Sequence, residues 1–257
     1  MKWPNTLLLI RHDVSKYNIL KEKKAGDPTY QEFLKAFEKD PFDDKTKELA
    51  LKVQKLFSLN NGDHNTPLIE DDIEKRGEKV GKALREKHKL PDIIYVSPFE
   101  RTLHTLERIT KGWPELEKVK RYEDERIREQ DHGLTLLYND WRVFHVLHPE
   151  QIELQKREGQ YWYRFPQGEN VPDVRTRNRS WLTTIIREHA GENILVVTHH
   201  LNILAARANL ERLNAEEFIR IDKEEKPINL GVTTYKGNPN KGKAGKLELV
   251  CYNKKYY

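Results

Sequence analysis

The sequence predicts an α/β fold, a three-layer α/β/α sandwich with a mostly parallel sheet. Two short apolar runs, residues 6–10 and 193–197, are each followed two positions later by a histidine. Such runs are typical of parallel strands buried on both faces, and segments with helical spacing separate them from further strands. Open α/β sheets bind ligands at the carboxyl edge of their strands. We therefore expect His12 and His199 to meet there.

The first quarter of the chain after the opening strand is predicted to be helical. Ser15 is placed to cap a helix that ends near Gly26. Apolar residues then recur at helical spacing in residues 30–39 and 44–57. We expect these segments to form a helical insertion at about residues 24–66.

The rest of the chain is predicted to alternate helices with strands. The expected elements are a helix at 70–87, a strand at 92–96, a helix opened by Ser97 with Pro98 in its first turn, a weaker strand at 118–122, a helix at 171–189, the strand at 193–197, a helix at 201–210, and a hairpin of 231–235 with 247–251. Dense aromatic residues between Tyr138 and Tyr163 favour a helical cap at about 134–170. We expect one domain over residues 1–257.

Composition excludes several classes of protein. Cys251 is the single cysteine, so the chain cannot form an intrachain disulfide. The net charge of +5 arises between Lys226 and Tyr257, where seven lysines accompany one acid, Glu248. Interleaved glycine, asparagine and proline in that segment favour a solvated hairpin loop over a tail that binds nucleic acid. The apolar runs are too short for a bilayer span or a signal peptide, so we expect a cytoplasmic protein without a membrane partner.

Four short motifs combine residues suited to phosphate chemistry. They are Arg11-His12-Asp13-Val14-Ser15-Lys16-Tyr17-Asn18, Ser97-Pro98-Phe99-Glu100-Arg101-Thr102, Glu129-Gln130-Asp131-His132-Gly133 and Val197-Thr198-His199. A phosphomonoester is a dianion, and the forked donors of Arg11 and Arg101 suit its oxygens, with Asn18 as a neutral donor. Taken singly, each residue also fits an ordinary structural role, such as a polar residue at the end of a strand.

In this order the motifs resemble the RHGxSxxN, SPxxRT, glutamate and VxH signatures of the histidine phosphatase superfamily, branch 1. The resemblance implies a phosphoglycerate-mutase-like fold in which His12 attacks phosphorus and forms a phosphohistidine. It implies that Glu129 protonates the departing alkoxide and then activates water, and that His199 helps to hold the phosphate. This chemistry needs neither a metal nor a cofactor.

A further segment suggests residues that bind the substrate. Tyr163-Arg164-Phe165-Pro166-Gln167-Gly168-Glu169 is similar to the YRxPxGE segment of the fructose-2,6-bisphosphatase branch. The resemblance implies substrate contacts for Tyr163, Arg164 and Arg177, although that branch's further lysine and arginine are not matched here. We therefore favour a phosphatase of a small phosphomonoester, and leave its identity and the oligomeric state open.

Two residues depart from the family pattern. Asp13 and His200 stand where glycine is usual after each catalytic histidine. A carboxylate beside a dianionic phosphate would weaken binding by repulsion unless it were paired. We predict that Asp13 pairs with His200, which stabilises the protonated ring and raises the pKa of His200. His200 is also a candidate for binding substrate.

Three other functions remain open from the sequence. One is a phosphotransferase of the phosphoglycerate mutase type, although the ERxYG segment of those enzymes is not matched. Another is a pseudophosphatase that binds a phosphorylated ligand, with turnover weakened by Asp13. The last is a metal site of the two-histidine-one-carboxylate type built from His12, Asp13, His199 and His200, which the neighbouring arginine charges disfavour.

Overall fold

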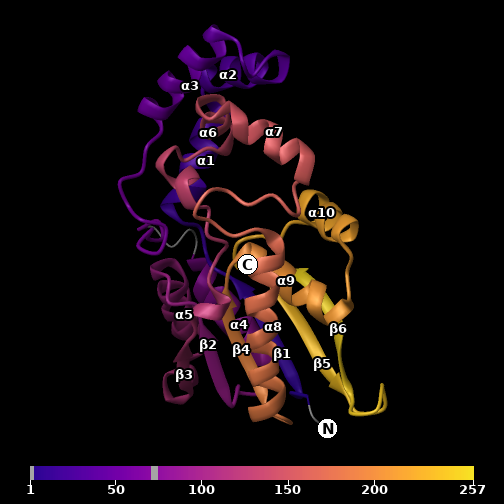
Figure 1. Ribbon diagram of the computed structural model, residues 1–257. Coiled ribbons are helices and arrows are strands. Elements are labelled where there is room, and N and C mark those ends of the chain that lie inside the picture. Colours follow the sequence, from indigo (N-terminus) through magenta and orange to yellow (C-terminus); the bar gives the residue numbers. More distant parts are fainter. Residues whose placement is uncertain (1–2, 71–74) are drawn as a thin grey trace. The chain divides into compact units, whose positions relative to one another are not determined.

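The two strands that lead to His12 and His199 lie side by side in one sheet. In the computed structural model, which describes residues 3–70 and 75–257, the strands are β1 (Thr6–Arg11), β2 (Ile93–Val96), β3 (Lys120–Glu123), β4 (Asn193–Thr198), β5 (Val232–Asn238) and β6 (Lys246–Lys254). Their order is β3-β2-β4-β1-β5-β6, from left to right in Figure 1. The first four strands pair in parallel, and β5 and β6 extend one edge as an antiparallel hairpin.

Register places the ends of β1 and β4 together. Arg11 pairs with Thr198, so the next residues, His12 and His199, leave the sheet at the same edge. The backbone nitrogen of His12 donates to the carbonyl oxygen of Thr198 at 2.9 Å. The predicted meeting of the two histidines at the carboxyl edge is confirmed.

Helices cover both faces of the sheet and form the expected three layers. They are α4 (Arg76–Lys87) and α5 (Glu100–Gly112) on one face, and α8 (Val171–Glu188) and α9 (His200–Glu211) on the other. Leu8 and Ile10 point into the first layer, and Leu7 and Leu9 into the second. Because a strand buried on both faces has no polar side to alternate with, it reads as a continuous apolar run. The predicted α/β sandwich is confirmed.

Two glycines allow α4 and α5 to pack closely. A Cβ atom at Gly81 would lie 2.0 Å from the carbonyl oxygen of Ile109, and one at Gly112 would lie 2.0 Å from that of Glu78. Neither distance is compatible with a side chain, so the helices approach through backbone contacts. This packing fixes the positions of arginines on both helices.

The chain divides into two compact units. Unit 1 comprises Met1–Val14, Pro67–Glu129 and Asp173–Tyr257 and contains the sheet, whereas unit 2 comprises Ser15–Thr66 and Gln130–Pro172. Unit 2 therefore includes both segments expected to be the insertion and the cap. Their role as a cap remains a prediction.

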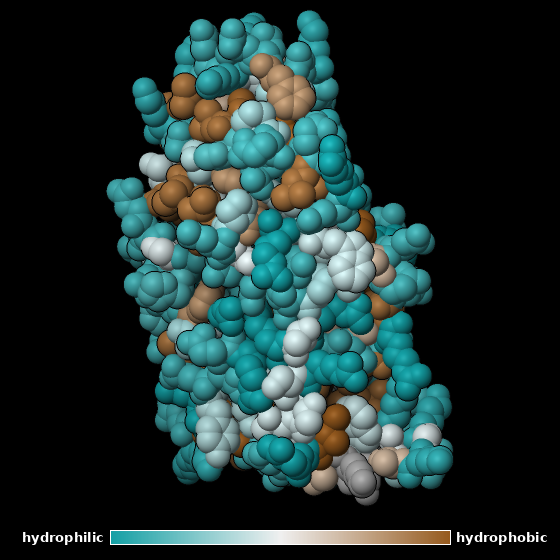
Figure 2. Space-filling view, viewed as in Figure 1, coloured by the Kyte–Doolittle hydropathy of each residue, from teal (hydrophilic) through white to brown (hydrophobic). Residues whose placement is uncertain are grey.

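Unit 2 is helical and has its own core. Its helices are α1 (Lys16–Gly26), α2 (Pro28–Lys39), α3 (Asp44–Leu56), α6 (Trp141–Leu147) and α7 (Pro149–Glu158). Phe33, Val53 and Val143 pack in that core, and the buried ammonium of Lys24 lies 2.9 Å from Oδ2 of Asp140. Figure 2 shows a mostly hydrophilic face, with hydrophobic groups gathered over the region labelled α3 and α6 in Figure 1.

Several element boundaries differ from those expected. Helix α5 begins at Glu100 with Phe99 as its N-cap, so Pro98 precedes the helix and is not in its first turn. Helix α4 begins at Arg76, and part of the helix expected at 70–87 lies at 71–74, outside the described residues. Helix α10 (Ala215–Glu224) was not predicted, although Asn214 and Glu217 form a capping box at its start.

No helix in the described ranges combines the length and the apolar character that crossing a bilayer requires.

Candidate active site

His12 is held in the tautomer that a nucleophile needs. The ring is buried at the end of β1, and its Nδ1 lies 2.6 Å from the carbonyl oxygen of Asp13. A carbonyl oxygen can only accept a hydrogen bond, so Nδ1 carries the proton. The lone pair is then on Nε2, which is the atom left to attack an electrophile.

His199, at the end of the neighbouring strand, packs against His12. The two ring centroids are 5.3 Å apart and the rings meet edge to face. Nε2 of His199 lies 2.7 Å from Oγ of Ser97, so the serine of the second motif orients this ring. The buried Nδ1 of His199 has no hydrogen-bond partner in the part of the chain that the structure describes.

Two arginines influence both histidines. Burial lowers the pKa of His12 well below its ordinary value, and the nearby charges of Arg101 and Arg11 lower it further. Burial and the charge of Arg101 also lower the pKa of His199. Both rings are therefore neutral at pH 7. Arg11 donates from Nη1 to the carbonyl oxygen of Pro227 at 2.7 Å, which restrains its guanidinium.

Glu129 lies beside the start of α9 in the same unit. Its Oε1 accepts a hydrogen bond from the backbone nitrogen of Leu201 at 3.2 Å, in the first turn of that helix. The positive end of a helix dipole favours a carboxylate there. The predicted general acid and base is therefore fixed relative to the strand that ends in His199.

Arg177 is engaged with the backbone that leads to Glu129. Its Nη1 donates to the carbonyl oxygens of Arg126 at 2.9 Å and Arg128 at 2.8 Å, and its Nη2 donates to that of Glu129 at 2.9 Å. These bonds hold the segment that presents the carboxylate. The predicted contact of Arg177 with substrate remains a prediction.

The predicted pair between Asp13 and His200 is wrong. Oδ1 and Oδ2 of Asp13 each lie 2.9 Å from a guanidinium nitrogen, of Arg76 and Arg108 respectively. Nε2 of His200 instead lies 2.6 Å from Oδ1 of Asp222. Burial lowers the pKa of His200, opposite to the predicted rise. The two side chains have partners on different helices: Arg76 and Arg108 come from α4 and α5, and Asp222 comes from α10.

The alternative metal site is not assembled. The carboxylate of Asp13 is taken up by two arginines, and the ring of His200 turns to Asp222. Within residues 3–70 and 75–257, no three histidine, cysteine, aspartate or glutamate side chains converge as metal ligands would.

The other predicted substrate residues belong to unit 2. Asn18 completes the capping box of α1, in which Ser15 is the N-cap and Oδ1 of Asn18 accepts from the backbone nitrogen of Ser15 at 3.0 Å. The buried hydroxyl of Tyr163 donates to Oε1 of Gln151 at 3.0 Å, and burial raises its pKa to about 12. Arg164 is exposed. Contact of these side chains with substrate remains a prediction.

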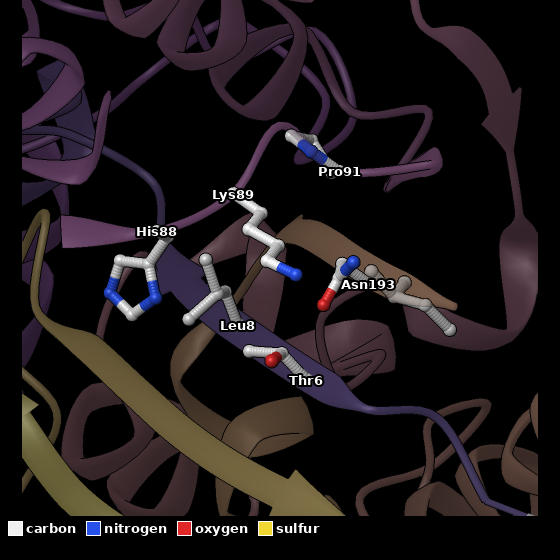
Figure 3. A pocket seen from close by; sticks show the side chains of 7 residues that line it. Thr6, Leu8, His88, Lys89, Pro91 and Asn193 are labelled. Atoms are coloured by element: carbon white, nitrogen blue, oxygen red, sulfur yellow. The ribbon is translucent and has the colours of Figure 1, made fainter. Parts of the chain in front are cut away.

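A small cavity lies at the opposite edge of the sheet, at the beginnings of β1 and β4. Its volume is about 10 Å³, and Figure 3 shows Thr6, His88, Lys89 and Asn193 among its lining. A cavity of this size holds about one water molecule. It is too small for a phosphomonoester, and the residues that line it include none of the four motifs.

Comparisons with known proteins agree with this arrangement. A model of the histidine phosphatase superfamily (branch 1) matches residues 58–243, well over half of the chain. The match begins after the motif that contains His12, near the end of the segment expected to be an insertion. The structure nevertheless brings His12 against His199, which lies within the matched range.

Individual relatives also come from families of phosphoglycerate mutases and phosphatases. Phosphoglycerate mutase-like protein AT74H of Arabidopsis thaliana is 30% identical over 181 residues, which cover 62% of this chain and 61% of that protein. The match thus spans less than two thirds of that relative's length. Phosphoserine phosphatase 1 of Hydrogenobacter thermophilus is 28% identical over 155 residues, or 59% of this chain and 70% of that protein. The solved alpha-ribazole phosphatase from Shigella flexneri shares the fold, with a TM-score of 0.65, 17% identity, and coverage of 97% and 96%.

Proposed function

The chain belongs to branch 1 of the histidine phosphatase superfamily, and we propose that it is a metal-independent phosphatase that hydrolyses a small phosphomonoester through a phosphohistidine. The observation that carries this proposal is the fixed tautomer of His12. Its Nδ1 is bound to a carbonyl oxygen 2.6 Å away, and its pKa is lowered by burial and by two arginines. Such an imidazole is neutral, oriented and ready to attack phosphorus.

The first half of the reaction transfers the phosphoryl group to the enzyme. Nε2 of His12 attacks phosphorus, the bond from phosphorus to the alkoxide breaks, and Glu129 gives its proton to the departing oxygen. Arg11, Arg101 and His199 stabilise the charge on the three non-bridging oxygens. Splitting hydrolysis at this point replaces one difficult displacement with two easier ones.

The second half returns the enzyme to its starting state. Glu129, now a carboxylate, accepts a proton from water as the water oxygen attacks phosphorus and the phosphorus–nitrogen bond breaks. Inorganic phosphate leaves, His12 regains its lone pair and Glu129 holds a proton again. The backbone bond of Glu129 to Arg177 keeps the carboxyl group in place through both steps.

The sequence supports hydrolysis over phosphoryl transfer between substrates, because the ERxYG segment of the mutases is absent from positions 129–133. Among the relatives, phosphoserine phosphatase 1 is named as a phosphatase and AT74H as phosphoglycerate mutase-like. The pseudophosphatase alternative rested on an unpaired carboxylate at Asp13. Two arginines neutralise that carboxylate, so the repulsion it implied is removed.

The test is to trap the phosphoenzyme and to identify the residue that carries the phosphoryl group. We expect a labelled aryl phosphate to give an acid-labile, alkali-stable label on His12 in a rapid quench, and inorganic phosphate in steady state. His12→Ala should abolish both. His104→Ala, which changes a half-exposed histidine on α5, should change neither. A label on another histidine, or turnover by His12→Ala, would overturn the proposal.

A panel of phosphorylated compounds then identifies the class of substrate. Sugar phosphates, phosphoglycerates, phosphoserine, nucleotides and phosphopeptides should be compared by kcat/KM, with release of phosphate and transfer to a second phosphoglycerate measured in parallel. Transfer faster than hydrolysis would favour the mutase. A trapped phosphohistidine without turnover would favour the pseudophosphatase.

A further inference from the structure

Asp13 is a buried carboxylate with two cationic partners. Its side chain is 2% exposed, and its oxygens lie 2.9 Å from Nη2 of Arg76 and 2.9 Å from Nη1 of Arg108. The backbone nitrogen of Val14 also donates to Oδ1, at 2.8 Å. Burying a charge is costly unless it is paired and hydrogen-bonded, and this one is fully compensated. We call Arg76, Asp13 and Arg108 the Asp13 cluster.

The main chain of Asp13 is restrained as firmly as its side chain. Its nitrogen donates to Oγ1 of Thr105 at 2.9 Å. Its carbonyl oxygen accepts from Nδ1 of His12, and also from Nδ2 of Asn229 at 3.1 Å, which donates to the carbonyl of His12 at 2.8 Å as well. The carbonyl oxygen of Asp13 sets the tautomer of His12. Every polar atom of Asp13, in its main chain and its side chain, has a hydrogen-bond or ion-pair partner.

The arginines of the cluster are themselves held in place. Nη2 of Arg108 donates to the carbonyl of Ile69 at 2.6 Å. The guanidinium of Arg76 stacks 4.5 Å from the ring centre of Tyr257, whose hydroxyl donates to the carbonyl of Asn229 at 2.9 Å. A Cβ at position 77 would lie 2.5 Å from Cβ of Arg108, so Gly77 lets α5 bring Arg108 close to α4. These contacts connect both helices and Tyr257 to the nucleophile's backbone.

We propose that Asp13 is a positioning residue: through the Asp13 cluster it holds its own carbonyl oxygen against Nδ1 of His12 and thereby keeps Nε2 as the reactive nitrogen. The proposal rests on the proposed function only in taking His12 as the nucleophile. The proposal gives Asp13 a supporting role, whereas the sequence alone suggested that its carboxylate would weaken phosphate binding unless it were paired. A glycine here would have neither the carboxylate nor the two arginine contacts.

The decisive measurement is the tautomer of His12 in the full chain, read from ¹⁵N chemical shifts of labelled histidine. We expect the wild-type ring to carry its proton on Nδ1. In Asp13→Asn, which keeps the shape but loses the charge, the two guanidinium groups repel each other and the peptide loosens. Both tautomers should then be populated.

Kinetics on an aryl phosphate should change in the same variants. We expect kcat to fall about 10–100-fold, the scale seen for partners that orient an active-site histidine. KM should change little, because Arg11 and Arg101 are intact. Asp13→Gly should behave like Asp13→Asn or worse.

A partly buried ion pair in unit 1, between Arg207 and Glu211, supplies the control. Nε of Arg207 lies 3.0 Å from Oε1 of Glu211, and neither residue contacts His12. Glu211→Gln should lower stability while leaving the ¹⁵N shifts and kcat as in the wild type. If the Asp13 variants do not fold, Arg108→Gln removes one ion pair and should produce the same tautomer mixture.

The outcomes separate this proposal from the proposed function. Folded Asp13→Asn with wild-type shifts and kcat, or a faster Asp13→Gly, overturns the positioning role even if His12 still carries the phosphoryl group. Arg108→Gln with an unchanged tautomer overturns it as well. Turnover by His12→Ala overturns the function, whereas the NMR result on His12 stands independently of any activity.

Discussion

The ring of His199 meets the ring of His12 edge to face, with their centroids 5.3 Å apart. Both rings are buried, and both have a pKa that burial and the charge of Arg101 lower. Two neutral imidazoles can lie this close without repulsion, whereas two imidazolium ions cannot. The neutral pair is therefore a property of the folded site, and it governs how the site responds to pH.

Activity should persist below the pH at which free histidine becomes protonated. Because the pKa of His12 is lowered well below its ordinary value of about 6.5, the nucleophile stays neutral as the pH falls through that range. We expect no acidic limb near pH 6.5 in kcat/KM for an aryl phosphate, and a limb well below it. An acidic limb in kcat/KM near pH 6.5 would contradict this.

Glu129→Gln should affect substrates according to their leaving groups. An alkoxide needs a proton as it leaves, so we expect kcat/KM for an alkyl phosphate to fall about 10²–10⁴-fold. An activated aryl phosphate needs little protonation and should fall much less. Glu125→Gln, at an exposed neighbouring position, should change neither rate. Equal losses on both substrates would rule out the acid role.

Arg177→Lys should act through Glu129. A lysine cannot span the three carbonyl oxygens that Arg177 binds, so the Glu129 segment loses its support. We expect about a tenfold fall in kcat for alkyl phosphates, a smaller fall for aryl phosphates and little change in KM. In a Glu129→Gln background the same change should have almost no further effect. A rise in KM alone would instead indicate direct contact with substrate.

Unit 2 should select the substrate without carrying the chemistry. Arg164→Ala should raise KM for the preferred substrate about tenfold, the loss of one charge-assisted hydrogen bond, and should reorder the substrate panel. Phosphohistidine formation from an aryl phosphate should be retained. Arg157→Ala, an exposed arginine of α7, is the control. Deleting the insertion is a poorer test, because Phe33 and Val53 pack with Val143 in one core.

Gly81→Ala should destabilise unit 1 by about 1–3 kcal/mol, since its Cβ would lie 2.0 Å from the carbonyl oxygen of Ile109. Denaturant unfolding measures the loss. Gly26→Ala is the matched control, because a Cβ there meets nothing within 4 Å and alanine is a better helix former at the end of α1. Equal stability of both variants would show that α4 and α5 can separate at little cost.

The sequence by itself determined the sheet and the residues at its edge. Strands buried on both faces must be apolar throughout, so β1 and β4 were recognisable without a partner, and the histidines follow them directly. Helix limits were less certain because caps and flanking residues compete locally. Pro98 lies outside its helix, and α10 was missed despite the capping box of Asn214 and Glu217.

Only the tertiary structure decided which charges meet. The chain has 46 lysines and arginines and 41 acids, so sequence pattern cannot choose among so many pairings. Asp13 pairs with arginines of two helices that pack through glycine, and Arg177 binds the backbone before Glu129. An ion pair depends on distance and burial rather than on periodicity, and both are set by how α4 and α5 pack on the sheet. The pairing of Asp13 with His200 failed for that reason.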